Sequence, residues 1–266
     1  RPELARAIFT APRDIFAVDS QQAEKFSHLA GSNPNKPRIH IGGSLKLNPA
    51  SLKIDEKLVD IFKTAANNRP VVVAASTHKG EETLIAKASR KARENGFPHF
   101  LIMAPRHPER GSEIAASLNG AGQRSKGIPP QPADDIYICD SLGEMGSLYT
   151  AADLIILGGT FADLGGHNPL EIALFETPVL AGASRFKNTQ AFAQLTHAGL
   201  IEQADDGATL ASALTTKLSA LREGRVLISD KDRKQIAAIA AEACSRATNT
   251  AKYVLDTLSE NTSSNT

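Results

Sequence analysis

The segment GGTFADLGGHNPLE, at residues 158–171, combines residue types that build a helix start with residue types that bind anions. Asparagine is a good helix N-cap and proline is favoured in the first helical turn, so Asn168 and Pro169 predict a helix start. Glu171 lies where it can reach back and complete a capping box. A purely structural interpretation therefore accounts for the Asn-Pro-x-Glu part of the segment.

That interpretation does not account for the glycines and the histidine that precede the helix. Glycine loses much conformational freedom on folding, so paired glycines indicate a positive φ or a close approach of other atoms. Backbone N–H groups at a helix N-terminus attract anions. We therefore predict an anion site at this helix start. The residues concerned are Gly158, Gly159, Gly165, Gly166, His167 and Asn168.

The segment ASTHKGEE, at residues 75–82, follows an apolar run and has a similar character. The hydroxyl groups of Ser76 and Thr77 can donate hydrogen bonds, and the N–H groups of the turn and the following helix point toward any anion there. The alternative is an ordinary polar turn whose glutamates favour the helix dipole. The residues alone leave both interpretations open.

The segment APRHPER, at residues 104–110, also follows an apolar run. The guanidinium of Arg106 suits a phosphate or a carboxylate, and Pro105 fixes the backbone beside it. A basic loop is more often solvated surface. Its place after a predicted strand favours binding.

A fourth segment, CDSLGEMGSLY at residues 139–149, carries a weaker signal. Asp140 or Ser141 can cap the following helix, and Gly143 and Gly146 allow the backbone to approach other atoms closely. A turn that enters a helix explains these residues without a ligand.

The elements that must position these segments are short apolar runs that alternate with amphipathic segments, as in βαβ units. Strands are predicted at residues 14–18, 38–41, 70–75, 99–104, 135–139, 153–157, 178–180 and 200–202. Helices are predicted at residues 20–30, 55–67, 81–95, 108–118, 143–152, 169–175 and 188–198, with two more after residue 210, the second at about 230–258. This pattern predicts a doubly wound α/β fold, in which ligands bind beyond the carboxyl ends of the strands.

A segment rich in proline and glycine, residues 32–51, interrupts this alternation and indicates a domain boundary. We predict that residues 1–47 are the tail of an amino-terminal domain with a hinge, and that residues 48–228 form a Rossmann-like nucleotide-binding domain. Residues 229–266 are predicted to form a long closing helix with a disordered tail. Because the chain begins at Arg1 within a helical pattern, we expect it to be a fragment.

The composition of the 266 residues excludes several classes of protein. Thirty Lys and Arg against 29 Asp and Glu leave a net charge of +1, so no global field favours nucleic acid or an anionic membrane. The two cysteines, Cys139 and Cys244, lack metal-binding spacing and predict reduced cytosolic thiols. No apolar run approaches the length of about 20 residues that spans a bilayer.

Four segments in the same order resemble the carboxyl-terminal half of the 3-deoxy-D-manno-octulosonic acid (Kdo) transferases of lipopolysaccharide synthesis. They are STHKGEE, APRHPER, LGEMGSLYTAAD and GGTFADLGGHNPLE, and the Gly-x-Leu-Lys at Gly43 to Lys46 also fits. The resemblance covers nearly the whole chain from about Asp14. Each motif is loose by itself, but their order and their positions after predicted strands make the resemblance specific.

The resemblance implies a GT-B glycosyltransferase that needs neither a metal nor a cofactor besides its substrate. Such an enzyme transfers Kdo from CMP-Kdo to a lipid A precursor at the cytoplasmic face of the bacterial inner membrane. Its carboxyl-terminal domain binds the donor, while its amino-terminal domain, usually membrane-anchored, receives the acceptor and supplies a carboxylate base. The resemblance thus implies that this chain is a soluble donor-binding half, inactive alone because the base is missing.

The resemblance also implies roles for individual segments. Residues 76–79 would approach the donor's phosphate or carboxylate, residues 105–107 would hold CMP, and residues 143–145 would line the base pocket. Residues 165–168 would form the helix-terminus cradle, and Glu171 would accept from the ribose hydroxyls. The implied donor-binding residues are Lys46, Ser76, Thr77, Lys79, Pro105, Arg106, His107, Gly143, Glu144, Met145, Gly165, Gly166, His167, Asn168 and Glu171.

The hinge departs from the family's pattern. Ser44 and Asn48 stand where the family commonly has asparagine and aspartate, which puts the hinge contacts in doubt. Lys46, at the same hinge, would add a positive charge near the leaving CMP. After Glu171 the family often continues with Pro-Ala-Ala, whereas residues 172–174 are Ile-Ala-Leu, a change that affects packing.

Two other functions stay open. The chain can belong to a GT-B transferase that uses a UDP- or GDP-sugar, and a preference for CMP would argue against that. It can also be a nucleotide-binding module without transfer activity, which would be favoured if the native gene lacked an amino-terminal half.

Overall fold

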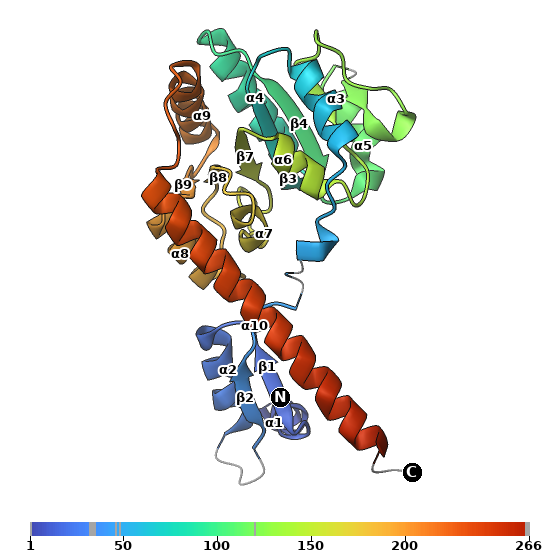
Figure 1. The fold of residues 1–266 in the computed structure, drawn as a ribbon, viewed down its shortest axis with the longest axis vertical. Coiled ribbons are helices and arrows are strands. Elements are labelled where there is room, and N and C mark those ends of the chain that lie inside the picture. The colour runs from blue at the N-terminus through green and yellow to red at the C-terminus, as the bar shows by residue number, and fades with distance from the viewer. Residues whose placement is uncertain (1, 32–35, 46, 48, 120, 264–266) are drawn as a thin grey trace. The chain divides into compact units, whose positions relative to one another are not determined.

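The computed structural model describes residues 2–31, 36–45, 47, 49–119 and 121–263, and it divides the chain into two compact units (Figure 1). The first unit combines Arg1–Pro49 with Ala240–Thr266, and the second is Ala50–Ile239. Helix α10, Asp230–Ser263, contributes residues to both. The expected hinge residue Lys46 lies outside the described residues.

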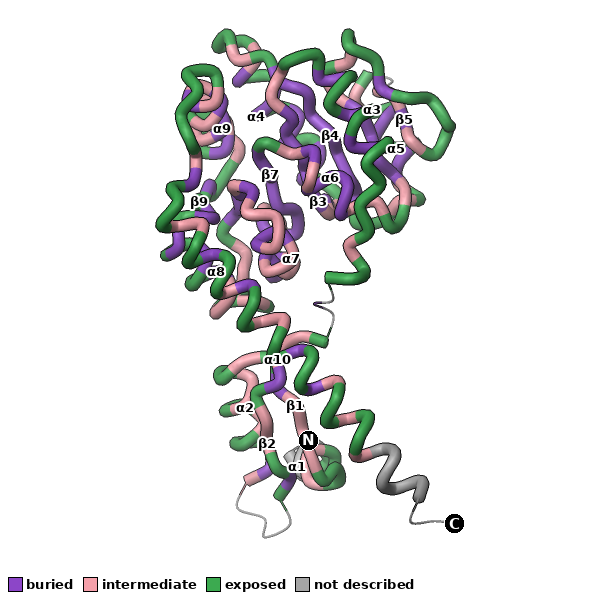
Figure 2. Tube along the Cα trace, viewed as in Figure 1, coloured by how far each residue is buried: buried purple, intermediate pink, exposed green. Residues whose placement is uncertain are grey.

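The larger unit is built on a seven-stranded parallel sheet with the order β5-β6-β4-β3-β7-β8-β9. Its strands β3, β4 and β7 are buried almost throughout (Figure 2). This is the consequence of uninterrupted apolar runs, which need cover on both faces of a sheet. The strands are β3 Val71–Thr77, β4 Phe100–Pro105, β5 Gly122–Gln123, β6 Ile136–Ile138, β7 Leu154–Leu157, β8 Val179–Ala181 and β9 Ile201–Gln203.

Helices cover both faces of this sheet. Val72 and Ala74 of β3 belong to an apolar cluster that includes residues of α4, α5 and α9, and successive side chains of a strand point to opposite faces. The other face carries α3 and α6, which pack against each other and against β3. The helices are α3 Glu56–Ala66, α4 Glu81–Glu94, α5 Gly111–Ser117, α6 Met145–Ala151, α7 Leu170–Ala173, α8 Thr189–His197 and α9 Gly207–Arg222. Short 3-10 turns are η1 Pro49–Ser51, η2 Pro108–Arg110 and η3 Arg124–Lys126.

The smaller unit contains two parallel strands, β1 Asp14–Ala17 and β2 Arg38–Ile41, with α1 Pro2–Thr10, α2 Ser20–Ala30 and the later part of α10. Asp14 accepts hydrogen bonds from Arg38 and from His40 at 2.8 Å, which lowers its pKa to about 2. Thr250 of α10 donates a hydrogen bond of 2.8 Å to the carbonyl of Gly42. Within the described ranges, no helix has the length and apolar character needed to cross a bilayer.

The structure confirms the α/β class and all eight predicted strands, and it differs in three details. The helix predicted at 108–118 is a 3-10 turn followed by α5, and the two-residue strand β5 was not predicted because it is too short to show a pattern. Helix α10 continues to Ser263, past the predicted end at 258, since the polar stretch beyond it contains neither glycine nor proline. Of the tail predicted to be disordered, residues 264–266 lie outside the described residues.

Candidate functional site

The candidate site lies where the order of the strands reverses. All strands of the large sheet are parallel, so their carboxyl ends meet at one edge. From β3 the chain proceeds to β4 on one side, and later returns to β7 on the other side of β3. Ligands of open parallel sheets bind at such a reversal. The loops after β3 and β7 are therefore the two that frame the site.

Close contacts at the start of the loop after β7 explain the first glycine pair. A Cβ atom at Gly158 would lie 2.4 Å from the carbonyl oxygen of Ser76, so only glycine fits there. Gly159 has a φ of +70°, and a Cβ atom there would lie 2.9 Å from the ring of His167. The prediction that close approach and positive φ require these glycines is confirmed.

The carboxylate of Glu81 holds the two loops in place. It accepts hydrogen bonds from the backbone N–H groups of His78 at 2.8 Å, Gly159 at 2.7 Å and Phe161 at 2.9 Å. Glu81 itself is buried. These three N–H groups are therefore bound to a protein carboxylate and are not available to the predicted anion.

Two histidines meet across the reversal point. Nε2 of His78, after β3, lies 2.8 Å from Nε2 of His167, after β7, and the two rings are nearly parallel. Burial is the main factor that lowers the pKa of both rings, that of His167 to about 4. Like charge acts in the same direction. His78 lowers the pKa of His167, His107 lowers that of His78, and Arg106 lowers both. Both rings are therefore neutral at pH 7.

Arg106 brings a positive charge to the site. It follows β4, its backbone N–H donates to the carbonyl of Thr77 at 2.9 Å, and its side chain is exposed. In the part of the chain that the structure describes, its guanidinium has neither an ion-pair nor a hydrogen-bond partner. His107 beside it is also exposed and makes an edge contact with the ring of His78 at 5.7 Å. Pro105 ends β4 and is buried.

Glu171 faces the same charge but does not cap its helix. Burial raises the pKa of its carboxyl group, while Arg106 lowers it. Among the described residues it has no hydrogen-bond partner, so the predicted capping box is wrong. The side chain of Asn168 instead accepts from the N–H of Leu170 at 3.1 Å, which completes the helix start without Glu171. The half-buried carboxyl group is left available to a ligand.

Two further expectations conflict with the structure. The side chain of Thr77 is fully buried, and its hydroxyl donates to Glu82, which pairs with Arg110 at 2.7 Å. The N–H groups of Gly165 and Gly166 donate to Ser184 Oγ and to the carbonyl of Gly159, both at 2.9 Å. Neither N–H is free for an anion, and α7 has only four residues. Thr77, Gly165 and Gly166 thus shape the site rather than present donors to a ligand.

The other predicted residues of the segment 75–82 and of the nucleobase pocket differ in burial and in their partners. Ser76 has a φ of +54° and is half-buried, and Lys79 is exposed. Gly143 has a φ of +83° with open space around it, whereas Met145 begins α6 and is half-buried. The carboxylate of Glu144 pairs with Arg124 at 2.9 Å and also accepts from Ser141 and Cys139. The carboxylate of Glu144 is therefore engaged within the protein, and only the backbone of this turn is left to contact the nucleobase of a ligand.

The expected caps of α6 are also wrong. Asp140 is buried and accepts from the N–H and hydroxyl of Ser125, both at 2.8 Å, so it fixes the turn after β5. Gly146 is required by close packing, because a Cβ atom there would lie 2.4 Å from the carbonyl oxygen of Lys53.

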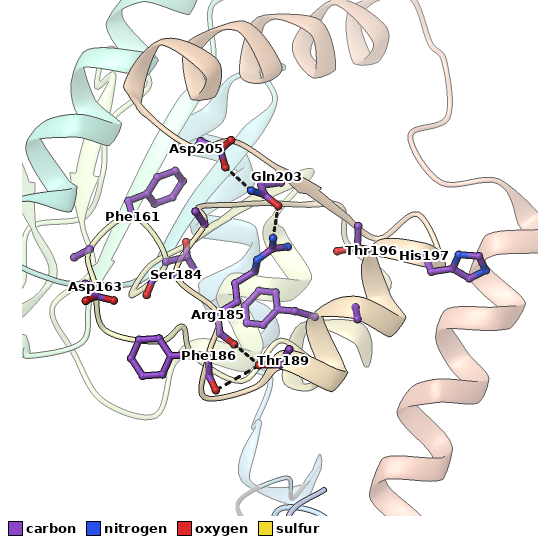
Figure 3. Close-up of a pocket in the computed structure, with 15 residues that line it drawn as sticks. Phe161, Asp163, Ser184, Arg185, Phe186, Thr189, Thr196, His197, Gln203 and Asp205 are labelled. Carbon is purple, nitrogen blue, oxygen red and sulfur yellow. Dashed lines mark hydrogen bonds between the residues drawn. The ribbon is translucent and has the colours of Figure 1, made fainter. Parts of the chain in front are cut away.

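A pocket of about 930 Å³ opens at the same edge, beyond β8 and β9 (Figure 3). Phe161 and Phe186 stand in its wall, and the guanidinium of Arg185 lies 5.8 Å from the ring centre of Phe192 and donates to Gln203 (Figure 3). None of the residues predicted from the sequence lines it. Its wall contacts the loop after β7, because Ser184, which lines the pocket, accepts a hydrogen bond of 2.9 Å from the N–H of Gly165.

Two residues of the site, His78 and Glu81, were not predicted from the sequence. Both stand in the segment ASTHKGEE, which was singled out, but Ser76, Thr77 and Lys79 were chosen there instead. A histidine directly after a buried strand was the available signal. Within the described ranges, no group of three or more His, Cys, Asp or Glu residues is arranged to hold a metal ion.

Curated relatives can be aligned with this chain along about half of their own length. A comparison of the chain with protein-family models gives no match. The 3-deoxy-D-manno-octulosonic acid transferase of Bordetella pertussis is 35% identical over 214 residues, which are 77% of this chain and 49% of that protein. The enzyme of the same name from Haemophilus influenzae is 32% identical over 190 residues, 68% of this chain and 43% of that protein. The chain thus spans about half the length of the curated relatives it matches.

Solved structures give the fold. The C-terminal CMP-Kdo binding domain of WaaA from Acinetobacter baumannii is 25% identical with a TM-score of 0.58, and the match covers 74% of this chain and 98% of that domain. A trehalose 6-phosphate synthase from Burkholderia multivorans is 15% identical with a TM-score of 0.60, over 99% of this chain and 62% of that one. Together with the parallel sheet, these matches give the chain a GT-B architecture.

Proposed function

We propose that this chain, a member of the family of the Kdo transferases, is the domain that binds the donor CMP-Kdo. The observation that supports this most directly is the unpaired guanidinium of Arg106 at the reversal point of the sheet. An exposed cation beside two neutral rings is suited to a phosphate. The A. baumannii domain, which the chain covers almost completely, is described as binding CMP-Kdo.

We propose that the complete enzyme transfers Kdo from CMP-Kdo to a lipid A precursor. In such a transfer the bond between the sugar and the phosphate oxygen breaks, and the electron pair stays on the phosphate. A fixed cation such as Arg106 stabilises that growing charge more than it stabilises the ground state, and so lowers the barrier. Glu171 would accept hydrogen bonds from the ribose hydroxyls of CMP. The base that activates the acceptor is not assigned to any described residue.

We propose that the transfer takes place at a membrane surface and needs no metal ion. A lipid acceptor lies in a membrane and a nucleotide donor is made in the cytoplasm, so transfer would occur at the cytoplasmic face of the inner membrane. Arg106 would supply the positive charge that a metal ion supplies in other transferases.

A nucleotide titration tests the proposal on the chain as it stands. CMP, UMP and GMP are titrated into the protein by calorimetry, with and without EDTA. We expect CMP to bind at least about tenfold more tightly than the others, a difference of about 1.4 kcal/mol, and EDTA to change nothing. Tighter binding of UMP or GMP would instead support a transferase with another donor. The absence of binding by all three would refute a donor-binding role.

A further inference from the structure

The contact between His78 and His167 restricts how many protons the two rings can hold. A hydrogen bond between two Nε2 atoms, here 2.8 Å long, needs one proton, so one ring donates and the other accepts. The pair therefore carries at most one positive charge while the bond persists. In the neutral pair one ring has no proton on Nδ1. Addition of one proton places it there and turns that nitrogen into a donor.

The groups around the pair favour the neutral form until an anion arrives. Three positively charged neighbours oppose protonation of the rings. Arg106 opposes it in both rings, Lys187 in His167, and His107 in His78. Two carboxylates act in the opposite direction: Glu81 and Glu82 raise the pKa of His78, but burial outweighs them. Glu81 also holds three backbone N–H groups, and Glu82 pairs with Arg110. The third carboxylate that faces the site is Glu171 on α7, near Arg106.

We propose that His78 and His167 act together as a phosphate-binding pair that takes up one proton when a nucleotide phosphate binds beside Arg106. The inference rests on the proposed function, because the phosphate is that of the donor. His78 extends the set of phosphate-binding residues beyond those that the sequence indicated. Its Nδ1 has no hydrogen-bond partner among the described residues, and in the protonated pair it donates to the phosphate.

Proton uptake makes the affinity for phosphate dependent on pH. The bound anion raises the pKa of the pair above its value in the free protein. Between these two values the complex holds one more proton than the free protein, so binding becomes tighter as the pH falls. For one full proton the dissociation constant decreases about tenfold for each pH unit.

The probe for the experiment is the methyl ester of CMP. Its phosphodiester has no proton that titrates near neutral pH, whereas a phosphate monoester has a second pKa near about 6 that would obscure the result. Binding is measured by calorimetry at pH 7 in buffers of different ionisation enthalpy, which counts the protons taken up. Cytidine, which lacks the phosphate, serves as the second probe.

We expect the ester to take up between about one half and one proton and cytidine to take up none. Between pH 8 and pH 6 the dissociation constant of the ester decreases by up to about a hundredfold. His78→Gln is expected to abolish the uptake and the pH dependence. His197→Gln removes an exposed histidine outside the pair and is expected to preserve both. Thermal unfolding of both variants shows that they are folded.

The outcomes separate the inference from the proposed function. If the ester binds tightly but takes up no proton, the inference is wrong and the donor-binding role stands. If His78→Gln is folded and retains the proton uptake, the pair is not the group that is protonated. If His78→Gln is unfolded, the ring signal of His78 is followed by NMR in the unmodified chain. A signal that does not shift when the ester binds would likewise exclude the pair. If neither ester nor cytidine binds at any pH, both proposals fall.

Discussion

The carboxylate of Glu81 accepts a hydrogen bond of 2.7 Å from the backbone N–H of Gly159, 78 residues further along the chain. The same carboxylate accepts from two other backbone N–H groups. Glu81 thereby joins the loop after β3 to the loop after β7 at the reversal point of the sheet. The position of His78 relative to His167 depends on this connection.

We predict that Glu81→Gln lowers the free energy of unfolding by at least about 2 kcal/mol, because hydrogen bonds to a charged acceptor are worth about 1.5–3 kcal/mol each. The amide NH2 group would also face backbone N–H donors. Urea unfolding measures the change. Glu56→Gln, at an exposed glutamate in the first turn of α3, is the matched control and should change stability by less than about 1 kcal/mol. Equal effects of the two substitutions would contradict the connecting role of Glu81.

Arg106→Ala is predicted to weaken CMP binding by about 1.5–3 kcal/mol, the usual worth of a hydrogen bond to a charged group. Because the guanidinium has no partner among the described residues, the unfolding temperature should not change. Calorimetric titration with CMP gives the affinity. Arg90→Ala removes an exposed arginine of α4 and is expected to leave the affinity as it was. If Arg106→Ala binds CMP normally, the phosphate site lies elsewhere.

Glu171→Gln is predicted to weaken CMP binding more than it changes stability. The carboxyl group is half-buried, its pKa is raised by burial, and it makes no hydrogen bond among the described residues. Its neutral isostere should therefore leave the free energy of unfolding unchanged or slightly higher. Parallel measurements of affinity and of urea unfolding test this. A loss of stability without a loss of affinity would restore the helix-capping role.

The stability of the large unit is predicted to fall below pH 6.5 because of His99. This ring is fully buried, its Nδ1 donates to the carbonyl of Phe97 at 2.9 Å, and its Nε2 accepts from Ser89 at 2.7 Å. Ser89 in turn accepts from Arg93 at 2.8 Å, and the positive charge of Arg93 opposes protonation of the ring. Burial lowers the pKa of His99 to about 4.

Stability falls with falling pH because the unfolded state binds one more proton at His99 than the folded state does. Between about pH 6.5 and pH 4 the unfolded ring is protonated and the folded ring is not, so stability decreases as the pH falls through this window. The total loss is a few kcal/mol, since each pH unit contributes up to about 1.4 kcal/mol. Urea unfolding at pH 7, 5.5 and 4.5 measures it. His99→Asn is expected to be less stable at pH 7 but to lose less stability on acidification, and an unchanged slope would exclude His99 as the source.

The strands, the class of fold and the segments that form the site could be predicted from the sequence, because they depend on neighbouring residues. An uninterrupted run such as residues 71–75 needs apolar cover on both faces wherever it lies. The glycines at 158–159 indicated a constrained backbone for the same local reason. The order of the motifs then indicated the family.

Only the tertiary structure decided which groups in those segments face a ligand. Thr77 ends one buried strand and Arg106 follows another, yet the hydroxyl of Thr77 donates to Glu82 while the guanidinium of Arg106 has no partner among the described residues. His78 and His167 are 89 residues apart, and no local pattern indicates that their Nε2 atoms lie 2.8 Å from each other. Hydrogen bonding and burial depend on residues that are distant in the chain, and only the tertiary fold determines which of them come into contact.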